Sequence, residues 1–248
     1  MAMTIVAEKS NGVVWATLTR PKNGNALDSA IVEELDNIID EAVAENQRLL
    51  VIRGNDRNFC TGFDLSGIEH LTDADLMLRF IRIELLLQKL AAVPLVTIAL
   101  VTGRAIGAGA DIVVACDRRF ATENASFSFP GAGFGLILGT HRLSCRVGLD
   151  RAREFVRSGR TLTASQALEA NLINAIVAPT QISSVIETEF AVAERLDTST
   201  HLALNEVTPI GDEDSALAAL ARSAARHGIK DRLLGYRSGL PSKPRSGT

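Results

Sequence analysis

Two short stretches of small residues carry the chemistry that this sequence indicates: 58–65 (NFCTGFDL) and 103–117 (GRAIGAGADIVVACD). The N–H of Phe63 follows a glycine bend in the first stretch. The N–H of Ala108 precedes a predicted short helix in the second, and the first N–H groups of a helix have no partner within it. Two such donors converging on one point would form an oxyanion hole, which stabilises a carbonyl oxygen as it gains negative charge. We therefore expect a protein that acts on acyl groups.

Each bend alone also has a simpler interpretation, as a tight connection between a strand and a helix. Gly62 permits the first turn and Gly107 the second. The triplet at 107–109 (GAG) resembles the start of a dinucleotide-binding loop, but it lacks a third glycine at the required offset. The presence of both bends in one chain favours the oxyanion interpretation.

Hydrophobic patterning predicts the elements that position these bends. We expect a hairpin at 4–8 and 13–19, strands at 49–53, 95–100, 118–121 and 126–129, a helix capped by Asp28 and running to about 45, and further helices at 73–92, 110–115, 140–146, 150–158, 164–170, 182–196 and 214–227. Strands and helices alternate, so the fold class is α/β. We place a soft boundary between a core at 1–195 and a helical region with a tail at 196–248. The end of that tail, 238–248, is rich in Gly, Pro and Ser, and we expect it to fray.

Composition excludes several classes of partner. The chain has 248 residues, with 26 basic and 29 acidic side chains and a net charge of -3. This balance offers no basic field for nucleic acid or an anionic membrane surface. The apolar runs are too short to span a bilayer, and the first residues lack the features of a signal peptide. Three cysteines without metal-ligand spacing indicate buried thiols, so we expect a cytoplasmic protein with no metal and no redox cofactor.

Further motifs follow in a definite order. They are Arg20-Pro21, 25–27 (NAL), 127–130 (FSFP), 139–143 (GTHRL) and 162–174 (LTASQALEANLIN). Together with the two bends, they make residues 20–177 resemble the crotonase superfamily, the family of enoyl-CoA hydratases and isomerases. The resemblance implies the crotonase (ClpP-like) spiral of ββα units with a helical C-terminal region, and assembly as a homotrimer or a dimer of trimers.

The resemblance also implies the ligand and its contacts. The N–H groups of Phe63 and Ala108 would face the thioester carbonyl of an acyl-CoA, so coenzyme A enters as part of the substrate. Arg20 and Lys22 would be available for its phosphates, although both also fit a solvated loop. The remaining substrate contacts would come from Ala26, Cys60, Gly62, Asp64, Leu65, Gly107, Pro130 and Gly131.

The acid and base depart from the family pattern. Hydratases of this family use two glutamates, one three residues after the second oxyanion donor and one directly after the proline of the FSFP strand. Here these positions hold Asp111 and Gly131. Asp111 is shorter by one methylene and also suits a helix N-terminus as a structural acid. His141 is the nearest histidine; it is a candidate base if it faces the pocket and otherwise a surface or capping residue.

Three hypotheses follow. The first is an enzyme that polarises an acyl-CoA thioester and moves a proton with Asp111, by isomerase-like or other enolate chemistry, without efficient two-glutamate hydration. The second is a protein that binds acyl-CoA and performs no chemistry. The third is a hydrolase on the same scaffold, with His141 and Asp111 activating water.

Overall fold

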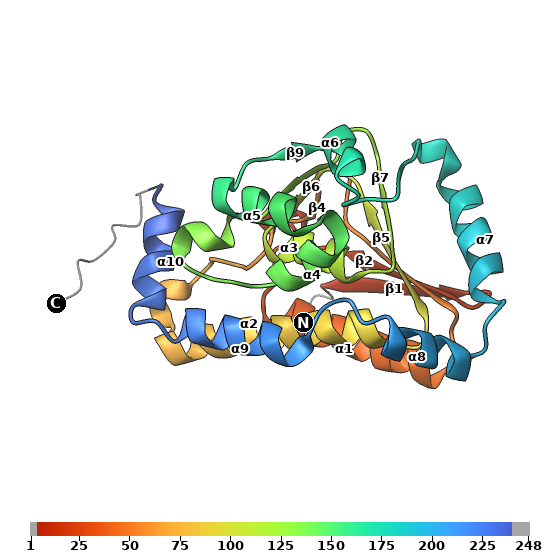
Figure 1. The fold of residues 1–248 in the computed structure, drawn as a ribbon, viewed down its shortest axis with the longest axis horizontal. Helices are drawn as coiled ribbons and strands as arrows, with labels where there is room; N and C mark the ends of the chain where they lie inside the picture. The colour runs from red at the N-terminus through yellow and green to blue at the C-terminus, as the bar shows by residue number, and fades with distance from the viewer. Residues whose placement is uncertain (1–3, 240–248) are drawn as a thin grey trace.

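The computed structural model describes residues 4–239, which form a spiral of repeated strand–strand–helix units (Figure 1). The three central units are β3 (Leu49–Arg53), β4 (Asn58–Cys60) and α2 (Asp73–Ala92); β5 (Val96–Val101), β6 (Arg104–Ile106) and α3 (Ala108–Ala115); and β7 (Arg118–Ala121), β8 (Ser126–Ser128) and α4 (Thr140–Val147). In each unit the first strand joins a six-stranded sheet and the second joins a four-stranded sheet. This confirms the predicted α/β class and the spiral of ββα units.

The larger sheet is mostly parallel and buried. Its strand order is β1-β2-β3-β5-β7-β10, with β1 (Ile5–Ser10) antiparallel to β2 (Val13–Leu18) and β10 (Ala175–Ile176) at the far edge. The smaller sheet has the order β4-β6-β8-β9, where β9 (Leu162–Thr163) is antiparallel to β8. Parallel strands covered on both faces carry apolar runs without alternation. That accounts for β3, in which Leu49, Leu50, Val51 and Ile52 are all buried.

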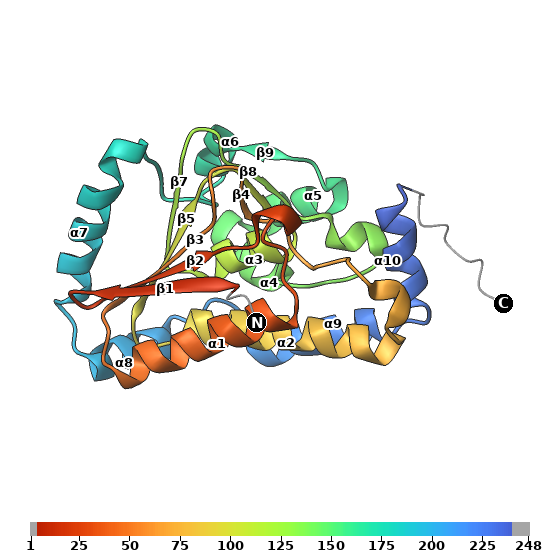
Figure 2. The same cartoon turned by 180° about the vertical axis from the view of Figure 1, so that it is seen from behind.

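Helices cover both faces of the larger sheet. The apolar side of α1 (Ser29–Ala44) packs against one face together with α2 and α3, and α7 (Ile182–Ala193) covers the opposite face (Figure 2). Asp28 caps α1 as predicted, since its carboxylate accepts a hydrogen bond of 2.9 Å from the N–H of Ile31. Two further helices, α5 (Leu149–Ser158) and α6 (Ala164–Glu169), lie between α4 and α7 along the chain.

The C-terminal part contains three helices: α8 (Thr198–Val207), α9 (Glu213–Ala224) and α10 (Ile229–Arg237). The sequence predicted only one, at 214–227. Helices α8 and α9 lie along α2, and α10 returns to the short 3-10 helix η3 (Pro130–Phe134) at one end of the molecule (Figure 1). Leu220, Ile229 and Leu233 pack there against Phe80 of α2. The prediction of a frayed tail concerns mainly 240–248, which lie outside the described residues.

The short strands β4 and β6 were not predicted, because three residues are too few for a periodic signal. They pair in parallel, with Cys60 opposite Ala105. The carboxyl ends of parallel strands emerge at the same edge of a sheet, so this pairing carries the two glycine bends to one place. None of the described helices is both long and apolar enough to cross a membrane.

Candidate active site

The bends after β4 and β6 are in direct contact. Gly62 has a φ of +89°, which side-chain-bearing residues rarely adopt. A Cβ atom added to Gly62 would lie 2.6 Å from the carbonyl oxygen of Ile106 and 3.3 Å from the amide nitrogen of Ala108. The first distance is too short for any side chain, so glycine is required here. The second places the nitrogen of Ala108 next to the residue that precedes Phe63.

The N–H of Phe63 takes no part in the hydrogen bonds that hold this bend. Phe63 forms an isolated parallel bridge with Leu27, in which the N–H of Leu27 donates to Gly62 and the N–H of Asp64 donates to Leu27, at 2.7 and 3.0 Å. Leu27 is thus hydrogen-bonded to the residues before and after Phe63, and the N–H and C=O groups of Phe63 take no part in the bridge. The N–H of Phe63 itself therefore points away from Leu27, and it has no acceptor within residues 4–239.

The N–H of Ala108 opens helix α3. Ala108 is the first helical residue, and no acceptor in the described chain takes its N–H. The positive end of the helix dipole lies at the same point. Helix α3 approaches β4 so closely that a Cβ on Gly109 would overlap the carbonyl group of Cys60. Small residues at 108–110 thus fix the helix N-terminus beside the Phe63 bend.

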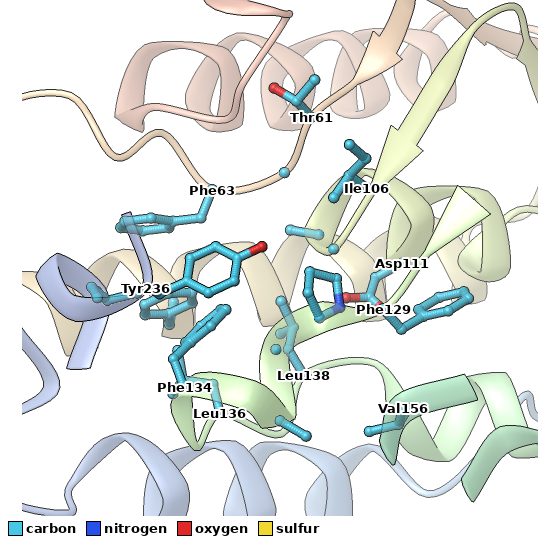
Figure 3. Close-up of a pocket in the computed structure, with 18 of the residues that line it drawn as sticks. Thr61, Phe63, Ile106, Asp111, Phe129, Phe134, Leu136, Leu138, Val156 and Tyr236 are labelled. Carbon is cyan, nitrogen blue, oxygen red and sulfur yellow. The ribbon is translucent and has the colours of Figure 1, made fainter. Parts of the chain in front are cut away.

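A largely apolar cavity lies in front of these two amides (Figure 3). The rings of Phe63 and Phe80 stack in its wall, with centroids 4.2 Å apart. Its walls are formed by Thr61, Gly62, Phe63, Leu65, Phe80, Ile106, Gly107, Ala108, Asp111, Phe129, Pro130, Gly131, Ala132, Phe134, Leu136, Leu138, Thr140, Val156, Leu233 and Tyr236. An apolar acyl group of several carbons fits a wall of this composition.

Asp111 lies in the wall of the cavity, one helical turn after Ala108. Its residue is 4% exposed, and its Oδ1 atom is buried with no hydrogen-bond partner in the part of the chain that is described. Burial raises the pKa of Asp111 well above its usual range; nearby Arg142 opposes this rise, and Glu84 adds to it. A carboxyl with a raised pKa can both give and take a proton near neutral pH.

Tyr236 of α10 faces the cavity from the side opposite Asp111 (Figure 3). Its ring packs at 4.7 Å from that of Phe134, and its hydroxyl points inward. Among the residues that line this cavity, Asp111 and Tyr236 are the two titratable side chains. The sequence analysis missed Tyr236. A usable signal was present, because it is the only tyrosine of the chain and follows Leu233 at helical spacing.

The predicted substrate contacts divide into two groups. Gly62, Leu65, Gly107, Pro130 and Gly131 line the cavity, and Gly131 brings no side chain to it. Three others are buried outside its wall: Ala26, Cys60 and Asp64. The Cys60 thiol accepts a hydrogen bond from the N–H of Gly62, and burial raises its pKa to about 12, so it is neither ionised nor exposed.

Arg20 is engaged inside the protein. Its Nη1 atom lies 2.9 Å from Asp28 and 3.0 Å from Asp64, and it also donates to the carbonyl of Ala26. Two carboxylates thus balance its charge, and the side chain ties the loop before α1 to the residue after Phe63. Lys22 is exposed on the 3-10 helix η1 (Pro21–Asn23).

His141 is not brought to this cavity. It lies on the outward side of α4 and lines a different, more open depression together with Ser144, Arg153 and Asp212. Its Nδ1 atom accepts a hydrogen bond of 3.0 Å from the N–H of Asp212. The structure therefore separates His141 from Asp111 and from the two amides, contrary to the arrangement that a catalytic His141 requires.

Comparison with known proteins gives one consistent result. The model of the family "Enoyl-CoA hydratase/isomerase" matches residues 8–231. The chain is 31% identical over 183 residues to the short-chain-enoyl-CoA hydratase of Clostridium acetobutylicum, which covers 72% of this chain and 70% of that protein.

Solved structures agree with this result. A Bordetella parapertussis protein assigned as an enoyl-CoA hydratase/isomerase superposes with a TM-score of 0.93 at 38% identity, over 98% of this chain and 100% of the other. An enoyl-CoA hydratase/isomerase of Xanthobacter autotrophicus gives a TM-score of 0.83 at 26% identity, over 96% and 94% of the two chains. The family model spans both glycine bends, and the chain belongs to the enoyl-CoA hydratase/isomerase family.

Proposed function

We propose that this protein binds an acyl-CoA thioester with the carbonyl oxygen between the N–H groups of Phe63 and Ala108, and that Asp111 moves a proton at the adjacent carbons. The observation that carries the proposal is the pair of amides that have no acceptor within residues 4–239 and belong to residues lining an apolar cavity, whose lining residues contribute one carboxyl group. Donors fixed before the reaction stabilise an enolate oxygen more strongly than a neutral carbonyl, and so lower the barrier to proton removal.

A single carboxyl suits a shift of a double bond. Asp111 in its ionised form takes a proton from the carbon next to the thioester of a 3-enoyl-CoA, and the electron pair passes to the carbonyl oxygen as a dienolate. The same carboxyl, now protonated, returns that proton to the far end of the conjugated system and yields the 2-enoyl-CoA. No water is consumed, and no second base is needed.

Hydration is the reaction that this cavity supports least. It needs one group to activate water and another to protonate carbon. The position after Pro130, where the family's second glutamate is expected, holds Gly131. The hydrolase hypothesis also loses its support, because His141 faces a different depression.

The test compares two reactions in the same enzyme. We expect the protein to isomerise 3-hexenoyl-CoA, to hydrate crotonyl-CoA at least about 100-fold more slowly, and to lose the isomerisation on Asp111→Asn. Efficient hydration of crotonyl-CoA that persists in Asp111→Ala would refute the proposal. Tight binding of acyl-CoA without turnover at any chain length would instead favour the second candidate, a binding protein, for which the missing side chain at Gly131 is the supporting observation.

The remaining expectations follow from the family. We propose that coenzyme A arrives as part of the substrate with no further cofactor, that the protein is cytoplasmic, and that it assembles as a homotrimer or a dimer of trimers. Sedimentation equilibrium of the full chain, whose mass is 26.5 kDa, measures the assembly. A monomer at micromolar concentration would exclude it.

A further inference from the structure

Three ionisable side chains from three helices are buried close to the cavity, and one of them, Asp111, lines it. Glu84 of α2 is fully buried, Arg142 of α4 is 1% exposed and Asp111 of α3 is 4% exposed. Helices α2 and α4 both pack against α3, and Asp111 interacts electrostatically with both Glu84 and Arg142. Two carboxyls and one guanidinium therefore share a site with almost no access to water.

Glu84 and Arg142 are bonded to each other. The Nη2 atom of Arg142 lies 2.5 Å from Oε1 of Glu84. Gln88, one turn along α2, donates to the same oxygen at 3.1 Å and to the carbonyl of Glu213 at 3.0 Å. This arrangement fixes the carboxylate of Glu84 on the guanidinium and braces it against α9.

The Asp111 carboxyl has no such partner. Its Oδ1 atom is buried without a hydrogen bond in the described residues, as are Oε2 of Glu84 and Nε of Arg142, but Glu84 is bonded to Arg142 through Oε1 and Asp111 is bonded to no cation. The backbone of Gly139 packs directly against the Asp111 carboxyl group. A second buried negative charge without a bonded cation is strongly unfavourable, whereas a proton removes the charge. Of the two carboxyls, the one without a bonded cation is the one that holds the proton.

We propose that Glu84 and Arg142 are positioning residues for Asp111, because by pairing with each other they leave the Asp111 carboxyl protonated in the empty site. The inference deepens the proposed function and rests on it only for the role of Asp111 in turnover. It means that the resting protein carries its transferable proton on Asp111. Asp111 can then protonate a bound enolate directly. Removal of a proton from the substrate needs the ionised form of Asp111, which is the minor form in the empty site.

The other elements packed against α3 bring no competing charge to Asp111. On β4 the Cys60 thiol is neutral, with a pKa of about 12. On β6 the side chain of Arg104 is engaged with Asn58 at 2.9 Å, and Arg104 is exposed. Strand β5 contains no titratable residue. Glu84 and Arg142 are thus the two charges that act on Asp111 from its neighbours.

The first experiment does not depend on activity. An infrared difference spectrum between the wild-type protein and Asp111→Asn at pH 7 should contain the carbonyl stretch of a protonated carboxyl, which a carboxylate lacks. Absence of that band would overturn the proposal. If the band is present and no acyl-CoA is turned over, the protonation inference stands and the proposed function fails.

The second experiment is a double-mutant cycle on stability. At pH 7 we expect Asp111→Asn to raise the folding equilibrium constant of the wild type, since the folded protein holds a proton on Asp111 that the unfolded chain releases, and a neutral amide carries no such cost. In a Glu84→Gln background Asp111 becomes the only carboxylate for Arg142, and Asp111→Asn should lower the constant about 10- to 1000-fold. Equal effects in both backgrounds would overturn the proposal. If Glu84→Gln does not fold, the infrared comparison decides.

The third measurement is a pH profile of proton removal from an acyl-CoA. Glu84→Gln releases Arg142 toward Asp111, lowers the pKa of Asp111 and should move the acid limb down by about one pH unit or more. The matched control is Glu154→Gln, which removes a carboxylate from an exposed pair with Arg160 and should leave the limb in place. A reduced rate with an unmoved limb in Glu84→Gln would assign the pair a purely structural role and refute the inference.

Discussion

Replacement of Ala108 by proline removes one backbone donor and puts the ring Cδ in its place, without breaking an internal hydrogen bond of the described chain. Ala108 is the first residue of α3, the helical position that proline tolerates best. Its N–H has no acceptor in residues 4–239, so no internal hydrogen bond is lost, and the bond from the N–H of Asp111 to the carbonyl of Gly107 at 2.9 Å does not involve it. Gly107, with a φ of +53° and a ψ of -124°, lies outside the α region that proline disfavours in a preceding residue. We therefore expect the free energy of unfolding to change by less than about 1 kcal/mol.

The effect on catalysis should be large. If the Ala108 N–H is one of two donors to the enolate oxygen, its loss costs about 2.7–4 kcal/mol in the transition state, or about 10²- to 10³-fold in kcat. The assay is the isomerisation of 3-hexenoyl-CoA, with Ala108→Gly as the matched control that keeps the N–H. We expect the control to retain kcat within about threefold of the wild type. A folded Ala108→Pro protein with wild-type kcat would refute the assignment of this amide to the oxyanion.

Three further predictions concern the two walls of the cavity. Tyr236→Phe removes only a hydroxyl group and keeps the ring packed on Phe134, so we expect unchanged stability. We expect kcat/KM for the isomerisation of 3-hexenoyl-CoA to fall about 3- to 10-fold. An unchanged kcat/KM would show that the hydroxyl does not contact the substrate. Gly131 has an ordinary φ, and a Cβ there would lie 3.3 Å from the carbonyl oxygen of Leu136, so Gly131→Glu should fold. We expect this variant to hydrate crotonyl-CoA faster than the wild type. A folded variant with no gain in hydration would contradict the view that the wild type lacks this second carboxyl group. Because the pKa of Asp111 is raised above 3.8 in the folded protein, the folded state keeps a proton that the unfolded state loses. The wild type should therefore lose unfolding free energy relative to Asp111→Asn as the pH rises from about 4 toward the raised pKa, and a difference independent of pH would contradict the shift.

The sequence predicted the parts of the site that depend on local backbone chemistry. Glycine at 62 and at 109 is needed where β4 and α3 approach without room for a side chain, and such glycines are visible in the sequence. The N-terminus of α3 could be placed because small residues are followed by a continuous apolar run. The family resemblance implied that the N–H groups of the two bends face one carbonyl, but the pairing of β4 with β6 that makes the bends neighbours was not predicted, since strands of three residues leave no pattern.

The side-chain directions on α4 show where prediction from sequence ends. His141 and Arg142 are adjacent, and successive residues on a helix point about 100° apart. The structure turns Arg142 inward to Glu84 and His141 outward to Asp212. An eight-residue helix that contains both apolar and charged residues does not reveal which face packs. The charged residue was therefore the buried one, and the candidate base was the exposed one.

The opposite wall of the cavity depends on packing between distant segments. Phe80 and Tyr236 are separated by more than 150 positions, and they meet only because α9 and α10 fold back along α2. Gly131 leaves the wall beside Pro130 without a titratable group, so the second titratable side chain among the residues that line this cavity, Tyr236, comes from α10. In a hydratase of this family, as the resemblance describes it, both carboxylates come from the core. Here the second titratable group comes from the C-terminal helix, so any change that displaces α10 should alter acyl-CoA turnover while leaving the two amides in place.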